Sequence, residues 1–133
     1  MLRVVVDAMG GDNAPVSNIQ GAVDAVNAKS DVTVLLVGRK EVITPELEKY
    51  TYDKERLVVV NATEVIETGE PPVKAIRAKK DSSIVVGMKL VKDGEADAFV
   101  SAGSSGAILV GGQVIVGRIK GIDRAPLAPL IPT

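Results

Sequence analysis

The sequence contains no cysteine, no histidine and no tryptophan. Without cysteine there is no disulfide framework or thiolate metal site. Without either cysteine or histidine, a nucleophile of those types and an imidazole base are excluded within this chain. Aromatic residues make up only 2% of the chain, so valine, isoleucine, leucine and alanine must form the core. The aromatic platforms on which single-stranded nucleic acids stack are missing as well.

An excess of charge of one sign is also lacking. The net charge is −1, so no global field steers the protein to nucleic acid or to an anionic membrane. Asp7 interrupts the first apolar run after three valines, and no apolar run has the length of a membrane span. With 46% hydrophobic and 25% charged residues among 133, the composition predicts one soluble domain of cytoplasmic type, without a signal peptide.

Strand-like and helix-like segments alternate along the chain. Strands are expected at residues 3–6, 31–38, 56–62 and 96–103. A helix is expected to start at Asn13-Ala14-Pro15, with Pro15 in its first turn. Further helices are expected at residues 44–50 (Thr44 as cap, Pro45 in the first turn), 73–80, 82–94 and 104–118. This order predicts a parallel sheet with helices on both faces and ligands at the carboxyl ends of its strands.

The loop after the first expected strand reads DAMGGDNAP. Gly10 and Gly11 allow a positive φ or a close approach of another backbone. Asp7 stands at the end of the strand, where a carboxylate faces the crevice and can orient a cation or a substrate hydroxyl. Asp12 or Asn13 has a simpler interpretation as the cap of the helix that follows.

The loop after the fourth expected strand reads VSAGSSGAIL. Small residues, hydroxyls and free N–H groups at a helix start make a cradle for anions. The loop matches neither the Walker A pattern nor Gly-x-Gly-x-x-Gly, and a tight turn with serine caps is an equal alternative. Glycines further along this expected helix, at positions 111, 112 and 117, indicate close contact with another backbone.

A basic segment lies between the two loops. Lys74, Arg77, Lys79 and Lys80 fall within seven residues and precede an expected helix start, with Ser82 or Asp81 as its cap. Composition alone favours a solvated helix face. The sharper hypothesis is a basic rim for an anionic substrate or an acidic carrier protein.

Five motifs occur in a fixed order: VDAMGGDNAP, ATEVIE, AIRAKKDSS, VSAGSSGA and GRIKGIDRAPLAPLIPT. Together they resemble the bacterial phosphate acyltransferases of phospholipid synthesis, the acyl-carrier-protein:phosphate transacylases, over residues 4–133. The resemblance implies a Rossmann-like α/β sandwich similar to the isocitrate and isopropylmalate dehydrogenases. It also implies transfer of a long acyl chain from acyl carrier protein to inorganic phosphate. Such proteins are cytoplasmic homodimers that associate peripherally with the membrane.

The sequence departs from the family pattern in three places. Asn13 replaces a histidine, and Ser104-Ser105 replaces Asn-Thr, so hydrogen-bonding capacity is kept. Family members are also much longer. The resemblance therefore implies that residues 1–133 are the amino-terminal α/β portion of a longer enzyme, without the remaining sheet and second lobe, and that this portion alone is inactive.

The implied chemistry needs no cofactor or metal. Phosphate is itself the nucleophile and needs positioning more than deprotonation, while the thioester carbonyl needs donors for its developing oxyanion. The residues assigned catalytic roles are Asp7, Lys79, Lys80, Ser104 and Ser105. The residues assigned to substrate or phosphate binding are Gly10, Gly11, Asp12, Asn13, Ser82, Ser101, Gly103 and Gly106.

Three alternatives stay open. A nicotinamide-dependent dehydrogenase has a related fold, but Gly-x-Gly-x-x-Gly is missing, and Gly38-Arg39 stands where an acidic residue would hold the ribose. A short-chain phosphotransacetylase using coenzyme A would share the chemistry. A catalytically inert fragment or interaction module would need neither substrate.

Overall fold

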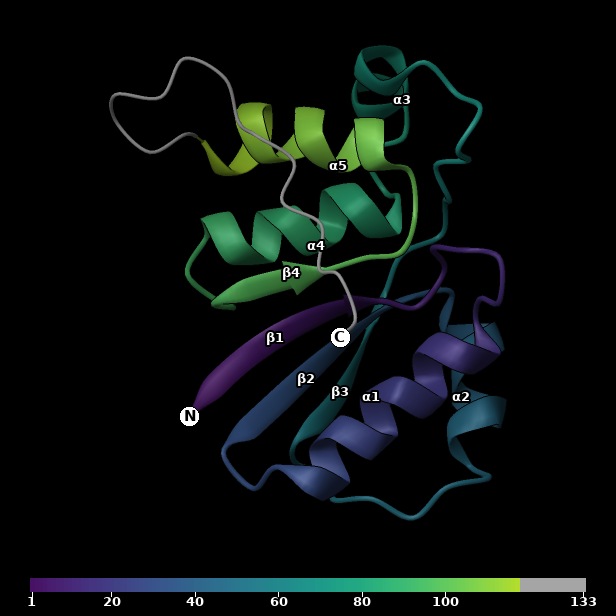
Figure 1. Cartoon of the computed structure of the whole chain (residues 1–133), viewed down its shortest axis with the longest axis vertical. Coiled ribbons are helices and arrows are strands. Elements are labelled where there is room, and N and C mark those ends of the chain that lie inside the picture. Colours follow the sequence, from purple (N-terminus) through teal and green to yellow (C-terminus); the bar gives the residue numbers. More distant parts are fainter. Residues whose placement is uncertain (118–133) are drawn as a thin grey trace, which may run out of the picture.

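The computed structural model describes residues 1–117. Within them, four strands form one parallel sheet in the order β3-β2-β1-β4 (Figure 1). The strands are β1 (Leu2–Asp7), β2 (Val32–Gly38), β3 (Leu57–Asn61) and β4 (Ala98–Val100). The predicted parallel α/β architecture is confirmed, and the likeness to the isocitrate dehydrogenase group stays a prediction. Most of the last of the five motifs, GRIKGIDRAPLAPLIPT, lies outside the described residues.

Helices α1 (Val16–Ala28) and α2 (Lys40–Leu47) cover one face of the sheet (Figure 1). Ile19, Val23 and Val26 recur at helical spacing on α1, and all three are buried against the sheet. Burying each such side chain contributes about 1.5–3 kcal/mol. The expected cap at Asp12 or Asn13 is wrong. Pro15 occupies the cap position, and the first turn of α1 is satisfied by backbone carbonyls.

Helix α2 begins four residues earlier than the sequence predicts. The Asn61 side chain accepts a hydrogen bond from the Lys40 N–H at 3.0 Å, which fixes the helix start at the end of β2. Ile43 and Leu47, one turn apart, are buried in the core below it. This burial holds the helix although Pro45 lies inside it, so Thr44 is not the cap and Pro45 is not in the first turn.

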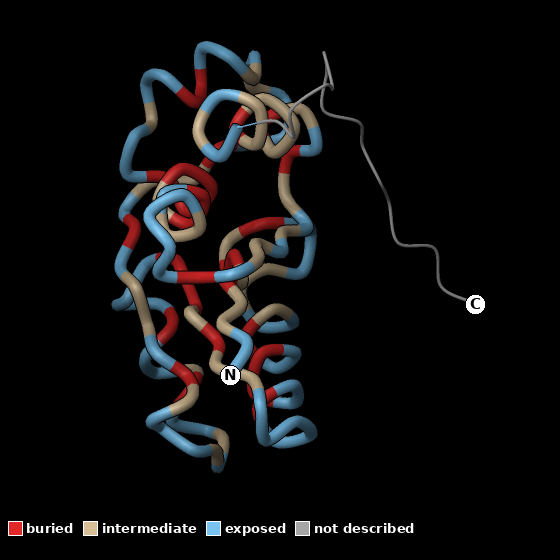
Figure 2. The backbone as a smooth tube through the Cα atoms, turned by 90° about the vertical axis from the view of Figure 1, so that its left-hand side faces the viewer, coloured by how far each residue is buried: buried red, intermediate tan, exposed pale blue. Residues whose placement is uncertain are grey.

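The other face carries two layers of helix (Figures 1 and 2). Helix α4 (Ser83–Lys92) packs on the sheet. Helices α3 (Pro72–Ala78) and α5 (Ser105–Gly111) pack together outside it, and the π-helical segment η1 (Gly112–Val116) continues α5. The predicted cap of α4 is confirmed, since the Ser82 hydroxyl accepts from the Val85 N–H at 3.3 Å. A buried apolar cluster fills the space between these helices.

Two expectations for the last described segment are wrong in detail. Strand β4 ends at Val100, three residues early, because Ser101 and Gly103 turn toward the end of β1 instead of continuing the ladder. The glycines of α5 do not meet another backbone. A methyl group on Gly106 would contact the side chain of Pro72, and one on Gly111 would contact the side chain of Met88.

The strand order places a crevice beside β1. The chain steps from β1 to β2 to β3 in one direction and then returns to the other side of β1 for β4. The helix after β1 lies on one face of the sheet, and the helix after β4 lies on the opposite face (Figure 1). Open parallel sheets bind ligands at such a reversal, outside the carboxyl ends of the strands.

Candidate functional site

A buried carboxylate ties together the two loops at the reversal. Asp7, only 2% exposed, ends β1, and its Oδ2 accepts a hydrogen bond from the Ser101 hydroxyl at 2.7 Å. Its Oδ1 accepts from the Met9 N–H at 2.9 Å, and the Ser101 oxygen in turn accepts from the Gly103 N–H at 3.0 Å. Both oxygens of Asp7 are therefore engaged, and the carboxylate positions the two loops.

The same loops approach at two glycines. A methyl group on Gly10 would lie 2.7 Å from the Gly103 nitrogen and 2.8 Å from Asp7 Oδ2. Gly11 beside it has a φ of +95°, a conformation that favours glycine. Both features that the sequence predicted for these glycines, positive φ and close approach, are confirmed, one at each residue.

Asn18 completes this junction, and the sequence analysis missed it. Its amide nitrogen donates to the carbonyls of Asp7, Ala8 and Gly10 at 3.2, 3.1 and 2.7 Å. Asparagine is a poor helix former, and its position in the first turn of α1 was the available signal. The Asn18 side chain therefore holds the loop that contains Gly10 and Gly11 in place.

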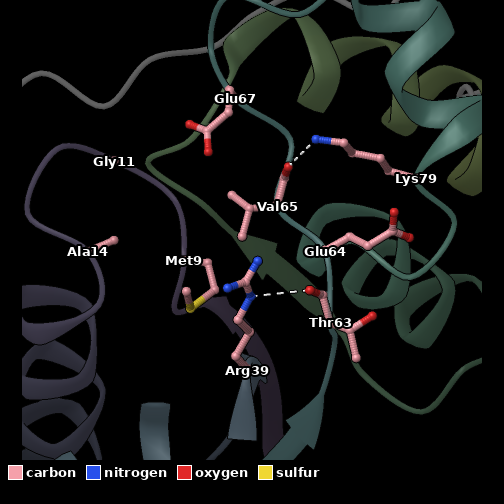
Figure 3. A pocket seen from close by; sticks show the side chains of 9 residues that line it. All are labelled: Met9, Gly11, Ala14, Arg39, Thr63, Glu64, Val65, Glu67 and Lys79. Atoms are coloured by element: carbon pink, nitrogen blue, oxygen red, sulfur yellow. Dashed lines mark hydrogen bonds between the residues drawn. The ribbon is translucent and has the colours of Figure 1, made fainter. Parts of the chain in front are cut away.

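Two adjoining cavities lie over the carboxyl ends of the strands. The larger, of about 550 Å³, reaches Arg39 after β2, the segment after β3, and Lys79 (Figure 3). The smaller, of about 270 Å³, reaches Asp12, Ala102 and Gly103. Both are lined by Met9, Gly11, Val65 and Glu67. Together the two cavities form one crevice along the carboxyl ends of the strands, and the name crevice is kept for it.

Residues 63–71 form the far wall of the crevice and are held by polar contacts. Asp81 accepts hydrogen bonds from the Thr63 N–H and hydroxyl, and Glu64 makes an isolated parallel bridge to Ser82. At the other end of this wall, Lys79 Nζ donates to the Val65 carbonyl at 2.7 Å and to a Glu70 carboxylate oxygen at 2.8 Å. The wall is thus tied to the start of α4 and to the end of α3.

These contacts shift two carboxyl groups in the same direction. The hydrogen bond from Lys79, and then that from the Glu67 N–H, hold the pKa of Glu70 below its ordinary value. The Thr63 hydroxyl and N–H do the same for the pKa of Asp81. Both groups keep their charge in mildly acidic solution.

The crevice contains charges of both signs. Arg39 and Lys79 enter it from opposite sides, and each donates to a carbonyl of the far wall, Arg39 to Thr63 at 3.2 Å (Figure 3). Lys79 has three donors, and two are used. Glu64 and Glu67 also line the crevice. The cationic side chains of the lining can bind an anion, and its carboxylates can accept hydrogen bonds from amide groups of a ligand.

The structure brings some of the predicted site residues together and separates others. Those at the crevice or its glycine junction are Asp7, Gly10, Gly11, Asp12, Lys79, Ser101 and Gly103. Ser82 and Ser104 are buried helix caps, the latter accepting from the Ala107 N–H at 3.2 Å. Asn13, Lys80 and Ser105 are exposed and do not line either cavity. Gly106 packs on Pro72.

The loops after β2 and β3 supply most of the crevice residues that were not assigned to the site from the sequence. They include Arg39 and, within the motif ATEVIE, Thr63, Glu64, Val65 and Glu67. The sequence did carry a signal for them. The carboxyl ends of parallel strands lie on one side of the sheet, so each loop that follows a strand is a candidate for ligand binding.

No helix within residues 1–117 is both long and apolar enough to cross a bilayer. No group of three or more acidic, histidine or cysteine side chains is arranged to hold a metal ion in that range.

The fold and the crevice define a class: a parallel α/β protein with a crevice at its strand-order reversal. Residues 2–133 match the family model described as "Fatty acid synthesis protein", and the chain belongs to this family. It is 51% identical over 131 residues to a phosphate acyltransferase of Clostridioides difficile (strain 630), covering 98% of this chain and 38% of that protein.

Two further relatives carry the same name. The phosphate acyltransferase of Alkaliphilus oremlandii is 53% identical over 132 residues, which are 99% of this chain and 39% of the relative. That of Clostridium beijerinckii is 53% identical over 131 residues, 98% of this chain and 39% of the relative. The chain thus spans well under half the length of the curated relatives that it matches.

Proposed function

We propose that this chain contributes the phosphate- and thioester-binding crevice of an enzyme that transfers a long acyl chain from acyl carrier protein to inorganic phosphate. The supporting observation is the crevice itself. It lies at the strand-order reversal of the sheet and combines glycine backbone with Arg39 and Lys79. Relatives about half identical to the chain are named phosphate acyltransferase.

The reaction would proceed by direct attack. A phosphate oxygen forms a bond to the thioester carbonyl carbon, and the carbon–sulfur bond then breaks. The products are an acyl phosphate and the carrier thiol, which takes up a proton. Phosphate needs no base at neutral pH, so the role of the protein is to position it and to stabilise the oxyanion. Lys79 and Arg39 offset negative charge, and the backbone of Gly11 and Gly103 allows close approach.

Asp7 and Ser101 act in this proposal as positioning residues. Their hydrogen bond fixes the glycine junction, and neither needs to touch the substrate. Lys80 and Ser105 are exposed and would act only if an acyl donor or a further part of the protein reached them.

The proposal extends to the whole protein. The chain corresponds to about 38–39% of its relatives. We therefore propose that it is the amino-terminal α/β portion of a longer cytoplasmic enzyme, a homodimer that associates with the membrane surface. The acyl phosphate made there would supply phospholipid synthesis.

The test is acyl-phosphate formation from palmitoyl-carrier protein and phosphate by the full-length protein. Lys79→Gln should raise the KM for phosphate about tenfold, since a charge-assisted hydrogen bond contributes about 1.5–3 kcal/mol. Lys89→Gln, an equal loss of charge on the exposed side of α4, is the matched control. Absence of acyl phosphate from the unmodified full-length protein would reject the proposal.

A further inference from the structure

Helix α3 presents cationic and apolar side chains on one exposed surface. A shallow groove runs along it, and we call this groove the α3 groove. It is lined by Pro71, Pro72, Val73, Lys74, Arg77 and Ala78. Val73, which lines this groove, is 49% exposed and leaves apolar surface beside the two cations. Both charged residues of the groove are cations, in a chain whose net charge is −1.

The two cations of the groove differ from Lys79 in how they are used. Lys74 and Arg77 are three residues apart on α3, so their side chains share one face of the helix. Both are exposed. None of the ion pairs among the described residues includes either of them, whereas Lys79 is paired with Glu70 at 2.8 Å. Both side chains can therefore form ion pairs with a bound partner.

The α3 groove lies beside the crevice. Helix α3 follows directly on the far wall, and Lys79 just after it lines the larger cavity. At the other end of α3, a methyl group on Gly106 would lie 2.7 Å from Pro72 Cγ, so the groove also adjoins the helix that follows β4. A protein bound in the α3 groove would stand next to the Lys79 end of the crevice.

We propose that the α3 groove docks an acidic helix of the carrier protein that delivers the acyl thioester. This inference rests on the proposed function. Carboxylates of the partner helix would meet Lys74 and Arg77, and its apolar side chains would cover Val73 and the two prolines. Complementary charge speeds association and selects the partner. A flexible thioester arm would then enter the crevice past the far wall.

The experiment compares two double variants of the full-length protein. Lys74→Gln/Arg77→Gln removes both cations of the α3 groove. Lys89→Gln/Lys92→Gln removes the same charge at the same spacing from the last turn of α4, away from the groove. The readouts are the Kd for the carrier protein by fluorescence anisotropy, and the separate KM values for acyl-carrier protein, a carrier-free acyl-pantetheine thioester and phosphate.

We expect the groove variant to raise the Kd and KM for the carrier protein about five- to tenfold at low salt. The KM values for acyl-pantetheine and phosphate should stay within about twofold, because the crevice is intact. Raising the salt to about 0.5 M should remove most of the difference between the variant and the unmodified protein. The α4 variant should match the unmodified protein throughout.

Several results would overturn the docking surface. Equal effects of the two double variants would mean that only net charge matters. Loss of binding to vesicles of anionic lipid, or of self-association in sedimentation, with carrier binding unchanged would assign the groove to a membrane or to a second copy. The anisotropy measurement needs no turnover. An unmodified protein that binds the carrier through the groove but makes no acyl phosphate would therefore reject the proposed function alone.

Discussion

The two walls of the crevice are built in opposite ways. The near wall, formed by the loops after β1 and β4, is held by a buried carboxylate, three carbonyls bonded to Asn18 and the contact of Gly10 with Gly103. The far wall, residues 63–71, is held by Lys79, Glu70 and Asp81, which are half-buried or exposed. The near wall is therefore fixed by buried hydrogen bonds and a close backbone contact, and the far wall by polar contacts that water can replace.

The two walls therefore differ in how rigidly they are held. Buried hydrogen bonds are costly to leave unmade, so the near wall has one arrangement. Exposed ion pairs contribute little, so the far wall can shift at small cost. Such a crevice would suit the proposed reaction, in which a long, flexible acyl donor meets a small anion at a fixed place.

The largest expected effect is that of Gly10→Ala. The added methyl group would lie 2.7 Å from the Gly103 nitrogen, and backbone at that distance must move. We expect a loss of about 3 kcal/mol in the free energy of unfolding, at the upper end for overpacking. Urea unfolding followed by circular dichroism measures it.

Gly21→Ala is the matched control. Gly21 lies inside α1 with nothing within 4 Å of the added carbon, so this variant should gain up to about 1 kcal/mol from helix propensity. Equal stability changes in the two variants would contradict the close approach of the two loops.

The second effect concerns the buried carboxylate. Asp7→Ala leaves the Met9 N–H and the Ser101 hydroxyl without their acceptor. We expect a loss of about 2–3 kcal/mol, and about 1 kcal/mol for Ser101→Ala, because unpaired buried groups cost more than a lost bond. A double-mutant cycle should give a coupling of at least about 1 kcal/mol. Additive effects would show that Asp7 and Ser101 stabilise their loops independently.

The third prediction compares one helix cap on each side of the crevice. Ser104 caps α5 on the near wall, and Ser82 caps α4 at the base of the far wall. Each serine-to-alanine change should lower the stability by about 1 kcal/mol, as buried caps generally do. Ser105→Ala, at an exposed position beside Ser104, should change it by less than about 0.5 kcal/mol. Thermal unfolding of the three variants measures the comparison.

Local patterns explain what could be predicted. Apolar periodicity and the Ser82 cap indicate the elements, and their alternation predicts a parallel sheet. Both glycine-containing loops were therefore predicted at the ligand-binding edge. The start of α2 was not, because it depends on Asn61, a side chain from the next strand.

Contacts between distant residues explain what could not be predicted. Asp7 and Ser101 are 94 residues apart, and they meet only because β4 returns to the far side of β1. No local pattern contains that strand order. The cations around α3 form one group in the sequence, but the fold separates them. Lys79 lines the crevice, whereas Lys74 and Arg77 line the α3 groove outside it.

The smallest expected effect lies on the far wall and depends on pH. Lys79 and the Glu67 N–H lower the pKa of Glu70 in the folded protein. Its contribution to stability is therefore complete above the ordinary glutamate pKa of about 4.3 and is lost as the pH falls through the lower folded value. Glu70→Gln should remove this share, so the melting temperature of the variant should approach that of the parent as the pH falls below the ordinary glutamate range. Glu95→Gln, an exposed change outside the crevice, gives the baseline for losing one charge. A gap between Glu70→Gln and the parent that stays constant from neutral to acidic pH would mean that the far wall is held by buried contacts, like the near one.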